Sequence, residues 1–134
     1  MFGFYRMVTA VPRLYLADPA RNAEEVSALW QEAEADQAAV VLFPELTLTG
    51  YTAGDLFFQE RLYLAQNEAL DRLLHETRTL ESVAVLGLML RHNDHLYNVA
   101  AVIHRGEILG IVPKSYLPNK REFYEKRHFQ SGRE

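Results

Sequence analysis

The sequence predicts an α/β fold whose sheet begins with parallel strands and continues with antiparallel ones. The apolar run at residues 40–43 indicates a strand buried on both faces, which is typical of a parallel sheet. A helical pattern at residues 19–36 precedes this run, and a β-rich stretch at residues 6–11 precedes the helix. A strand, a crossover helix and a second strand form a right-handed βαβ unit. Shorter strand patterns later in the chain supply the antiparallel part.

The composition fits one globular domain and excludes several classes of function. The chain has 134 residues, of which 49% are hydrophobic and 24% are charged. A net charge of -4 argues against a dedicated nucleic-acid binder. The absence of cysteine excludes disulfides, a thiolate metal site and a cysteine nucleophile supplied by this chain. Neither a secretory signal nor a membrane-spanning apolar run is visible, so we expect a cytoplasmic protein that does not enter a membrane.

The first helix has a clear start and a clear apolar face. Asp18 is a candidate N-cap, and Pro19 suits the first turn of a helix. The residues expected to share the apolar face are Ala23, Val26, Trp30 and Ala33. We therefore interpret Trp30 as a core residue rather than a platform for a ligand.

A loop and a second helix are expected before the chain changes to short strands. Residues 47–54 form the loop, and Asp55 can cap a helix that runs to about residue 79. Strands are then expected at residues 82–90, 96–103 and 108–112, joined by turns at residues 92–95 and 105–107. His92 and His95 lie in the first of these turns, where no third ligand is near in sequence. We interpret both histidines as structural or surface residues, and we expect no metal site.

Two charged residues occupy equivalent positions just beyond strands that end on proline. Pro44 ends the apolar strand and Glu45 follows it, while Lys114 follows Pro113 at the end of a later strand. Ligands bind at the carboxyl edge of open α/β sheets, so Glu45 is a candidate general base. The alternative is an exposed loop glutamate or one paired with a nearby cation.

A basic and aromatic segment follows Lys114. In residues 114–129, lysines and arginines alternate with tyrosines and phenylalanines, a combination that can bind single-stranded nucleic acid. Glu122 and Glu125 dilute the positive charge, and the chain as a whole is acidic. We therefore expect no nucleic-acid partner.

Three motifs in this order resemble the nitrilase superfamily. They are Phe-Pro-Glu-Leu-Thr-Leu-Thr-Gly-Tyr at 43–51, Tyr-Asn-Val-Ala at 97–100, and Val-Pro-Lys-Ser-Tyr-Leu-Pro-Asn-Lys-Arg-Glu-Phe-Tyr-Glu-Lys-Arg-His-Phe at 112–129. More narrowly, they are similar to the amino-terminal glutaminase domains of glutamine-dependent NAD synthetases, over the whole chain. The resemblance implies a nitrilase-like α-β-β-α sandwich that is present only in part. Residues 1–134 would form its amino-terminal portion, with the remaining portion and a synthetase domain absent.

The resemblance also implies a role for individual residues. The superfamily uses a Glu-Lys-Cys triad, in which Glu45 corresponds to the general base and Lys114 to the lysine. Glu122 corresponds to a second glutamate that supports the triad, and Tyr51 lies in the loop that borders the acyl pocket. Free cysteine has a pKa of about 8.5, so a carboxylate and an ammonium group are needed to activate it and manage its proton. Lysine also adds positive charge where an oxyanion develops.

Two departures from the family pattern have consequences. The family often has tyrosine where this chain has Lys120, which changes the lining of the approach to the active site. The family's cysteine would lie past residue 134, so we expect no glutamine hydrolysis by this chain alone. The parent enzyme would hydrolyse glutamine and pass ammonia to a synthetase domain that amidates nicotinic acid adenine dinucleotide. That domain would use ATP and magnesium, whereas this segment would need no cofactor; a homo-oligomer is expected.

Two alternatives follow from the same residues. A different nitrilase-type amidase, such as a carbamoylase, would keep the base and the lysine without any synthetase domain. A non-catalytic binding or assembly module would keep the fold without a nucleophile.

Overall fold

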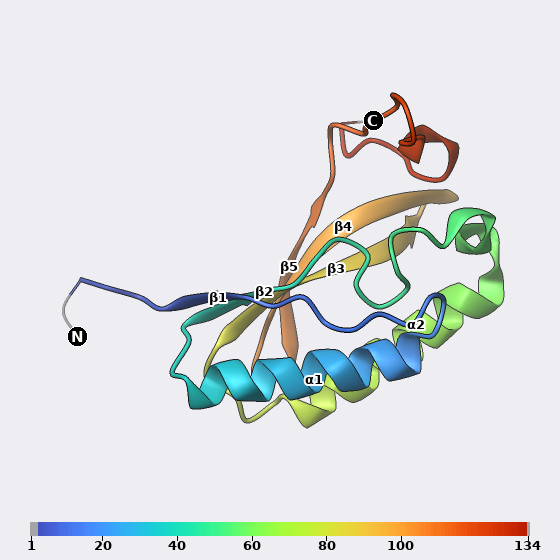
Figure 1. The fold of residues 1–134 in the computed structure, drawn as a ribbon. Coiled ribbons are helices and arrows are strands. Elements are labelled where there is room, and N and C mark those ends of the chain that lie inside the picture. Colours follow the sequence, from blue (N-terminus) through green and yellow to red (C-terminus); the bar gives the residue numbers. More distant parts are fainter. Residues whose placement is uncertain (1–2, 134) are drawn as a thin grey trace.

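The computed structural model describes residues 3–133 and contains one mixed sheet of five strands (Figure 1). The strands are β1 (Met7–Thr9), β2 (Val40–Leu42), β3 (Val83–His92), β4 (His95–His104) and β5 (Glu107–Pro113), and they lie in that order across the sheet. The first three strands run parallel, and β4 and β5 continue the sheet in antiparallel pairs. The predicted parallel start and antiparallel continuation are therefore confirmed.

Both long helices cover one face of this sheet. Helices α1 (Pro19–Ala35) and α2 (Glu60–Glu76) lie side by side beneath the strands (Figure 1). The Asp18 carboxylate accepts a hydrogen bond from the backbone N–H of Arg21, as expected of an N-cap. Trp30 is fully buried between the helices and the sheet, and its Nε1–H donates to Ser82 Oγ at 2.8 Å. Its predicted place in the core is confirmed.

The second helical segment is divided, which the sequence did not predict. A short 3₁₀ helix, η1 (Gly54–Phe58), ends at Gln59, whose extended backbone (φ -79°, ψ 126°) separates it from α2. Phe57 of η1 is buried in a small second core with Leu46, Met89 and Phe129. The packing of Phe57 therefore fixes η1 as a separate turn. Helix α2 ends at Glu76, earlier than expected.

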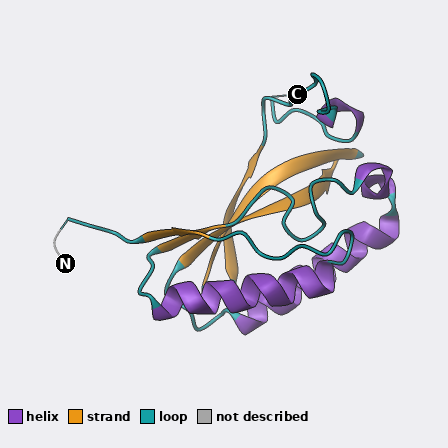
Figure 2. Cartoon of the chain, viewed as in Figure 1, coloured by secondary structure: helices purple, strands orange, loops and turns teal. Residues whose placement is uncertain are grey.

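The second face of the sheet is covered only in part. Residues alternate along each strand, so that Val41 faces the helices while Leu42 on the other side is 44% exposed. Val112 of β5 is 62% exposed on the same open face. The predicted burial of β2 on both faces is therefore wrong for these residues. The C-terminal segment lies at the far end of the sheet, on the side away from the helices (Figure 2), and Leu46 of the loop after β2 packs there with Met89 and Phe129.

The turn between β3 and β4 forms as predicted. His92 and His95 pair across the ladder, and the two residues between them, Asn93 and Asp94, have positive φ angles of 48° and 63°. Asparagine and aspartate tolerate this conformation, which two-residue hairpin turns require. Both histidines are exposed. Within residues 3–133, no cluster of histidine, aspartate and glutamate could hold a metal ion, and no helix could cross a membrane.

Candidate active site

Glu45 lies on a tight loop that rests directly on β3. The backbone N–H of Thr47 donates to the Gly87 carbonyl at 3.0 Å, and Leu46 adopts a positive φ of 50°. A Cβ atom added to Gly87 would lie 2.4 Å from the Leu46 nitrogen and 2.6 Å from the Glu45 Cα. Glycine at this position therefore allows the loop to approach the sheet and places Glu45 directly over β3.

Lys114 meets Glu45 at this point. Its backbone N–H donates to the Asn98 carbonyl of β4 at 2.8 Å, which fixes the chain as it leaves β5. Its ammonium Nζ donates to both carboxylate oxygens of Glu45 at 3.0 Å and to Glu125 Oε1 at 2.9 Å. Burial alone would lower the pKa of Lys114, but the hydrogen bonds and charges of Glu125 and Glu45 outweigh it and raise that pKa. The lysine is therefore held as a cation between two carboxylates.

The second carboxylate is Glu125 rather than Glu122. Glu125 begins the short helix η2 (Glu125–Arg127), and its side chain is only 5% exposed. Glu122 is exposed, and within the described part of the chain Lys114 forms ion pairs with Glu45 and Glu125 alone. The structure therefore does not bring Glu122, expected from the resemblance to support the triad, into contact with Lys114. The loop at residues 115–124 follows an irregular path, which turns Glu122 outward and Glu125 inward.

Tyr51 contacts this cluster through Glu125. Its hydroxyl donates to Glu125 Oε1 at 2.6 Å, although 74 positions separate the two residues. Burial, the hydrogen bond to Glu125 and the nearby negative charges all raise the pKa of Tyr51. The phenol therefore stays neutral and remains a donor. The other oxygen of Glu125, Oε2, is buried and has no hydrogen-bond partner within residues 3–133.

Asn98 completes the cluster, and the sequence did not single it out. It lies on β4, is 2% exposed, and its Nδ2 donates to Glu45 Oε2 at 3.0 Å. The available signal was its place in the Tyr-Asn-Val-Ala motif at residues 97–100, where it is a polar residue followed by apolar ones. Predicting Asn98 as a site residue required the register of β4 against β3, because this register places Asn98 on the same face as the Glu45 loop.

The cluster borders a cavity that can hold a small molecule. The cavity has a volume of about 290 Å³ and opens along the uncovered face of the sheet. Glu45, Asn98 and Lys114 line its polar end, and the apolar lining comes from Leu42, Val85, Ala100 and Val112. A base and a cation at one end of an apolar cavity can bind a polar group and move its proton. The sequence contains no cysteine to attack such a group.

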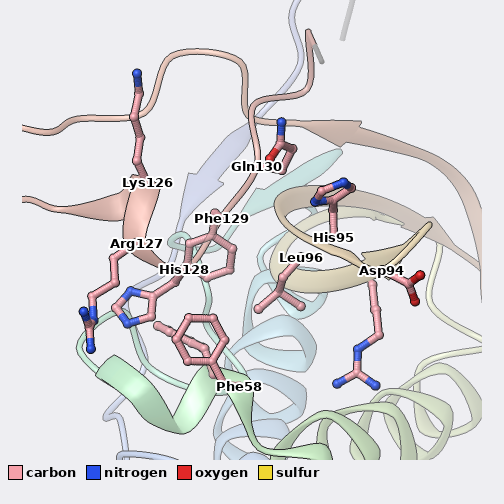
Figure 3. Close-up of a pocket in the computed structure, with 11 residues that line it drawn as sticks. Phe58, Asp94, His95, Leu96, Lys126, Arg127, His128, Phe129 and Gln130 are labelled. Carbon is pink, nitrogen blue, oxygen red and sulfur yellow. The ribbon is translucent and has the colours of Figure 1, made fainter.

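A larger hollow of about 380 Å³ lies elsewhere, between η1, η2 and the turn joining β3 and β4 (Figure 3). Arg127 donates two hydrogen bonds to Asp55, and these bonds, with that of His128, lower the pKa of Asp55. In Figure 3 the rings of Phe58 and His128 lie next to each other, while Lys126 points away from them. Asp55 thus offsets the positive charge of Arg127 at this edge. Neither Glu45 nor Lys114 lines this hollow.

The family of this chain follows from its similarity to known proteins. Residues 6–134 match the family model described as carbon-nitrogen hydrolase, so the chain belongs to the carbon-nitrogen hydrolase family. Among curated proteins, the chain is 45% identical over 130 residues to the glutamine-dependent NAD(+) synthetase of Mycobacterium tuberculosis, covering 97% of this chain and 19% of that protein. It is 41% identical over 99 residues to the synthetase of Aquifex aeolicus, covering 74% of this chain and 17% of that protein. The chain therefore spans about a fifth of the length of these relatives.

Solved structures confirm the nitrilase-like fold. A glutamine-dependent NAD(+) synthetase from Cytophaga hutchinsonii matches with a TM-score of 0.87 and 24% identity, over 95% of this chain and 22% of that chain. The synthetase from Acinetobacter baumannii matches with a TM-score of 0.78 and 30% identity, over 92% of this chain and 24% of that chain. An amidase from Nesterenkonia sp. matches with a TM-score of 0.81 and 23% identity, over 96% of this chain and 48% of that chain.

Proposed function

We propose that this chain is the amino-terminal part of the glutaminase domain of a glutamine-dependent NAD(+) synthetase. The observation that carries the proposal is the Lys114 ammonium held between the carboxylates of Glu45 and Glu125 beside an open cavity. The similarity to curated synthetases over 97% of the chain supports the choice of glutamine as the substrate. The parent enzyme would pass ammonia to the ATP-dependent amidation of nicotinic acid adenine dinucleotide.

The proposed reaction assigns one proton-transfer role to Glu45. Glu45 takes the proton from a cysteine thiol supplied by the sequence after residue 134, and the thiolate attacks the side-chain carbonyl carbon of glutamine. The carbon–nitrogen bond then breaks, and ammonia leaves with the proton from Glu45. Water gives a proton to Glu45 and attacks the thioester, which releases glutamate and returns the proton to the thiol.

Lys114, Glu125 and Tyr51 support this chemistry without exchanging protons. The Lys114 charge lies where it can stabilise the oxyanion of each tetrahedral intermediate. Glu125 keeps that ammonium group charged and in place, which is the role expected from the sequence for Glu122. Tyr51 fixes Glu125 through its hydroxyl.

The cofactors, cellular location and oligomeric state that we propose are those of the parent protein. Residues 1–134 form part of one domain and need no cofactor, while the synthetase domain uses ATP and magnesium. The parent enzyme acts in the cytoplasm as a homo-oligomer.

Ammonia release from glutamine tests the proposal. The gene is sequenced past the codon for Glu134, and the chain is expressed together with the downstream sequence. We expect glutaminase activity that Glu45→Gln and Lys114→Ala abolish, whereas Asn93→Asp in the exposed turn leaves it intact. Normal turnover by both active-site variants would overturn the assignment.

A second candidate is an amidase without a synthetase domain, because the Nesterenkonia amidase shares the fold of this chain. The downstream sequence separates the two candidates. A frame that carries a cysteine and then a Ser-Gly-Gly pyrophosphate loop supports the synthetase. A frame that ends after the hydrolase domain, with activity on amides other than glutamine, supports the amidase.

A further inference from the structure

Asn98 is placed to control the orientation of the proposed general base. It touches two of the three charged residues of the site, because its side chain donates to Glu45 Oε2 at 3.0 Å and its carbonyl accepts from the Lys114 backbone at 2.8 Å. Glu45 itself is 49% exposed and stands on a loop. Its carboxylate therefore needs partners to hold one orientation.

The two oxygens of Glu45 differ in the number of donors that they meet. Oε2 accepts from Asn98 Nδ2 and from Lys114 Nζ, whereas Oε1 accepts from Lys114 Nζ alone. Each oxygen of an ionised carboxylate offers two lone pairs. Both lone pairs of Oε2 are thus engaged, while one lone pair of Oε1 stays free. We infer that Asn98 is a positioning residue that directs the proton carried by Glu45 to Oε1.

An amide suits this role better than a charged side chain. The Asn98 Nδ2 donates to Oε2 whether Glu45 is ionised or protonated on Oε1, because Oε2 remains an acceptor in both states. The amide does not compete for the proton. An aspartate at this position would have the same shape, but its charge would repel Glu45 and it could not donate when ionised.

The first test needs only this 134-residue chain and does not depend on catalysis. The side-chain amide resonances of Asn98 are followed by ¹⁵N NMR as the pH is lowered. We expect them to shift as Glu45 gains its proton, and Glu45→Gln should remove this pH dependence. Asn93 provides the control, since its exposed amide should respond in the same way with and without Glu45. Identical Asn98 titrations in both proteins would overturn the inference.

The second test rests on the proposed function and uses the chain with its downstream sequence. Asn98→Asp and Asn98→Ala should lower kcat for glutamine by about tenfold or more, the effect expected of losing one hydrogen bond to a charged group. KM should change little, and Asn98→Ser, which keeps a donor, should recover part of kcat. A thermal unfolding curve for each variant separates this effect from loss of the fold.

The outcomes distinguish the two proposals. An active wild type with unaffected folded Asn98 variants would overturn the role of Asn98 and leave the glutaminase assignment standing. An inactive wild type whose Asn98 resonances still follow Glu45 would contradict the assignment and support the contact.

Discussion

The ammonium Nζ of Lys114 lies 3.0 Å from both carboxylate oxygens of Glu45, although 69 positions separate the two residues. Each residue follows a proline near the end of a strand, and the loop that carries Glu45 crosses over β3 toward Lys114, since β3 and β4 separate the two strands. The contact therefore depends on more than the two opposite charges. It also needs the loop that rests on Gly87 and the buried Glu125, which binds the same Lys114 ammonium group.

Gly87→Ala should displace the Glu45 loop. The new methyl group would lie 2.4 Å from the backbone atoms Leu46 N and Pro44 O, which cannot move aside as a flexible side chain can. We expect a loss of about 1–3 kcal/mol in the free energy of unfolding, typical of overpacking, as measured by urea denaturation. Gly110→Ala on β5 is the matched control, since an added Cβ there meets no atom within 4 Å. Equal stability of the two variants would contradict the described loop geometry.

Tyr51→Phe should weaken the support of the buried carboxylate. The variant removes one donor from Glu125 Oε1, so we expect a loss of about 1–3 kcal/mol in the free energy of unfolding. The raised pKa of Tyr51 should also appear in the wild type as a late phase of tyrosinate absorbance at high pH. Tyr51→Phe should remove that phase, whereas Tyr5→Phe, at an exposed position, should leave it in place. Persistence of the late phase in Tyr51→Phe would assign it to another residue.

The lowered pKa of Glu34 should make the free energy of unfolding decrease at acidic pH. Although burial opposes it, hydrogen bonds from Ser82 and the Glu81 backbone, with the His104 charge, lower the pKa of Glu34 below its ordinary value of 4.5. A lowered pKa in the folded state contributes stability that is present above the unfolded pKa and is lost as pH falls through the folded value. Urea denaturation should therefore show a decline below about pH 4.5 that is smaller in Glu34→Gln. Glu24→Gln, exposed on the same helix, should retain the wild-type decline.

The open face of the sheet should make the isolated 134-residue chain self-associate. Leu42 and Val112 leave apolar surface exposed there, and such surface favours burial against another molecule. Sedimentation velocity should show that Leu42→Lys and Val112→Lys reduce the association. Leu64→Lys provides the control, because Leu64 is equally apolar and exposed but lies on α2. Association that Leu64→Lys weakens as strongly would place the contact on the helical face.

Much of the fold could be predicted from the sequence because periodicity and prolines mark its elements. The capped start of α1, the apolar face around Trp30 and the hairpin at residues 92–95 all depend on local chemistry. Pro44 and Pro113 marked the two strand ends from which Glu45 and Lys114 project. The break at Gln59 could not be predicted, since it depends on the distant packing of Phe57 against Phe129.

The rest of the site depended on the path of an irregular segment. Residues 115–124 contain no regular helix or strand, and Arg121 adopts a positive φ of 57°. The family resemblance pointed to Glu122, whereas no periodic pattern tells which glutamate of such a segment points inward, so Glu125 was not singled out. Asn98 required the register of β4, which follows from the completed sheet.

The most direct measurement of the central claim compares two glutamates in the chain expressed with its downstream sequence. That claim is that Glu45, Lys114 and Glu125 form the catalytic cluster. We predict that Glu125→Gln lowers kcat for ammonia release from glutamine by about tenfold or more, because Lys114 loses a charged partner. Glu122→Gln, at an exposed position, should retain the wild-type rate. The reverse result, with loss of activity only in Glu122→Gln, would contradict the cluster described here.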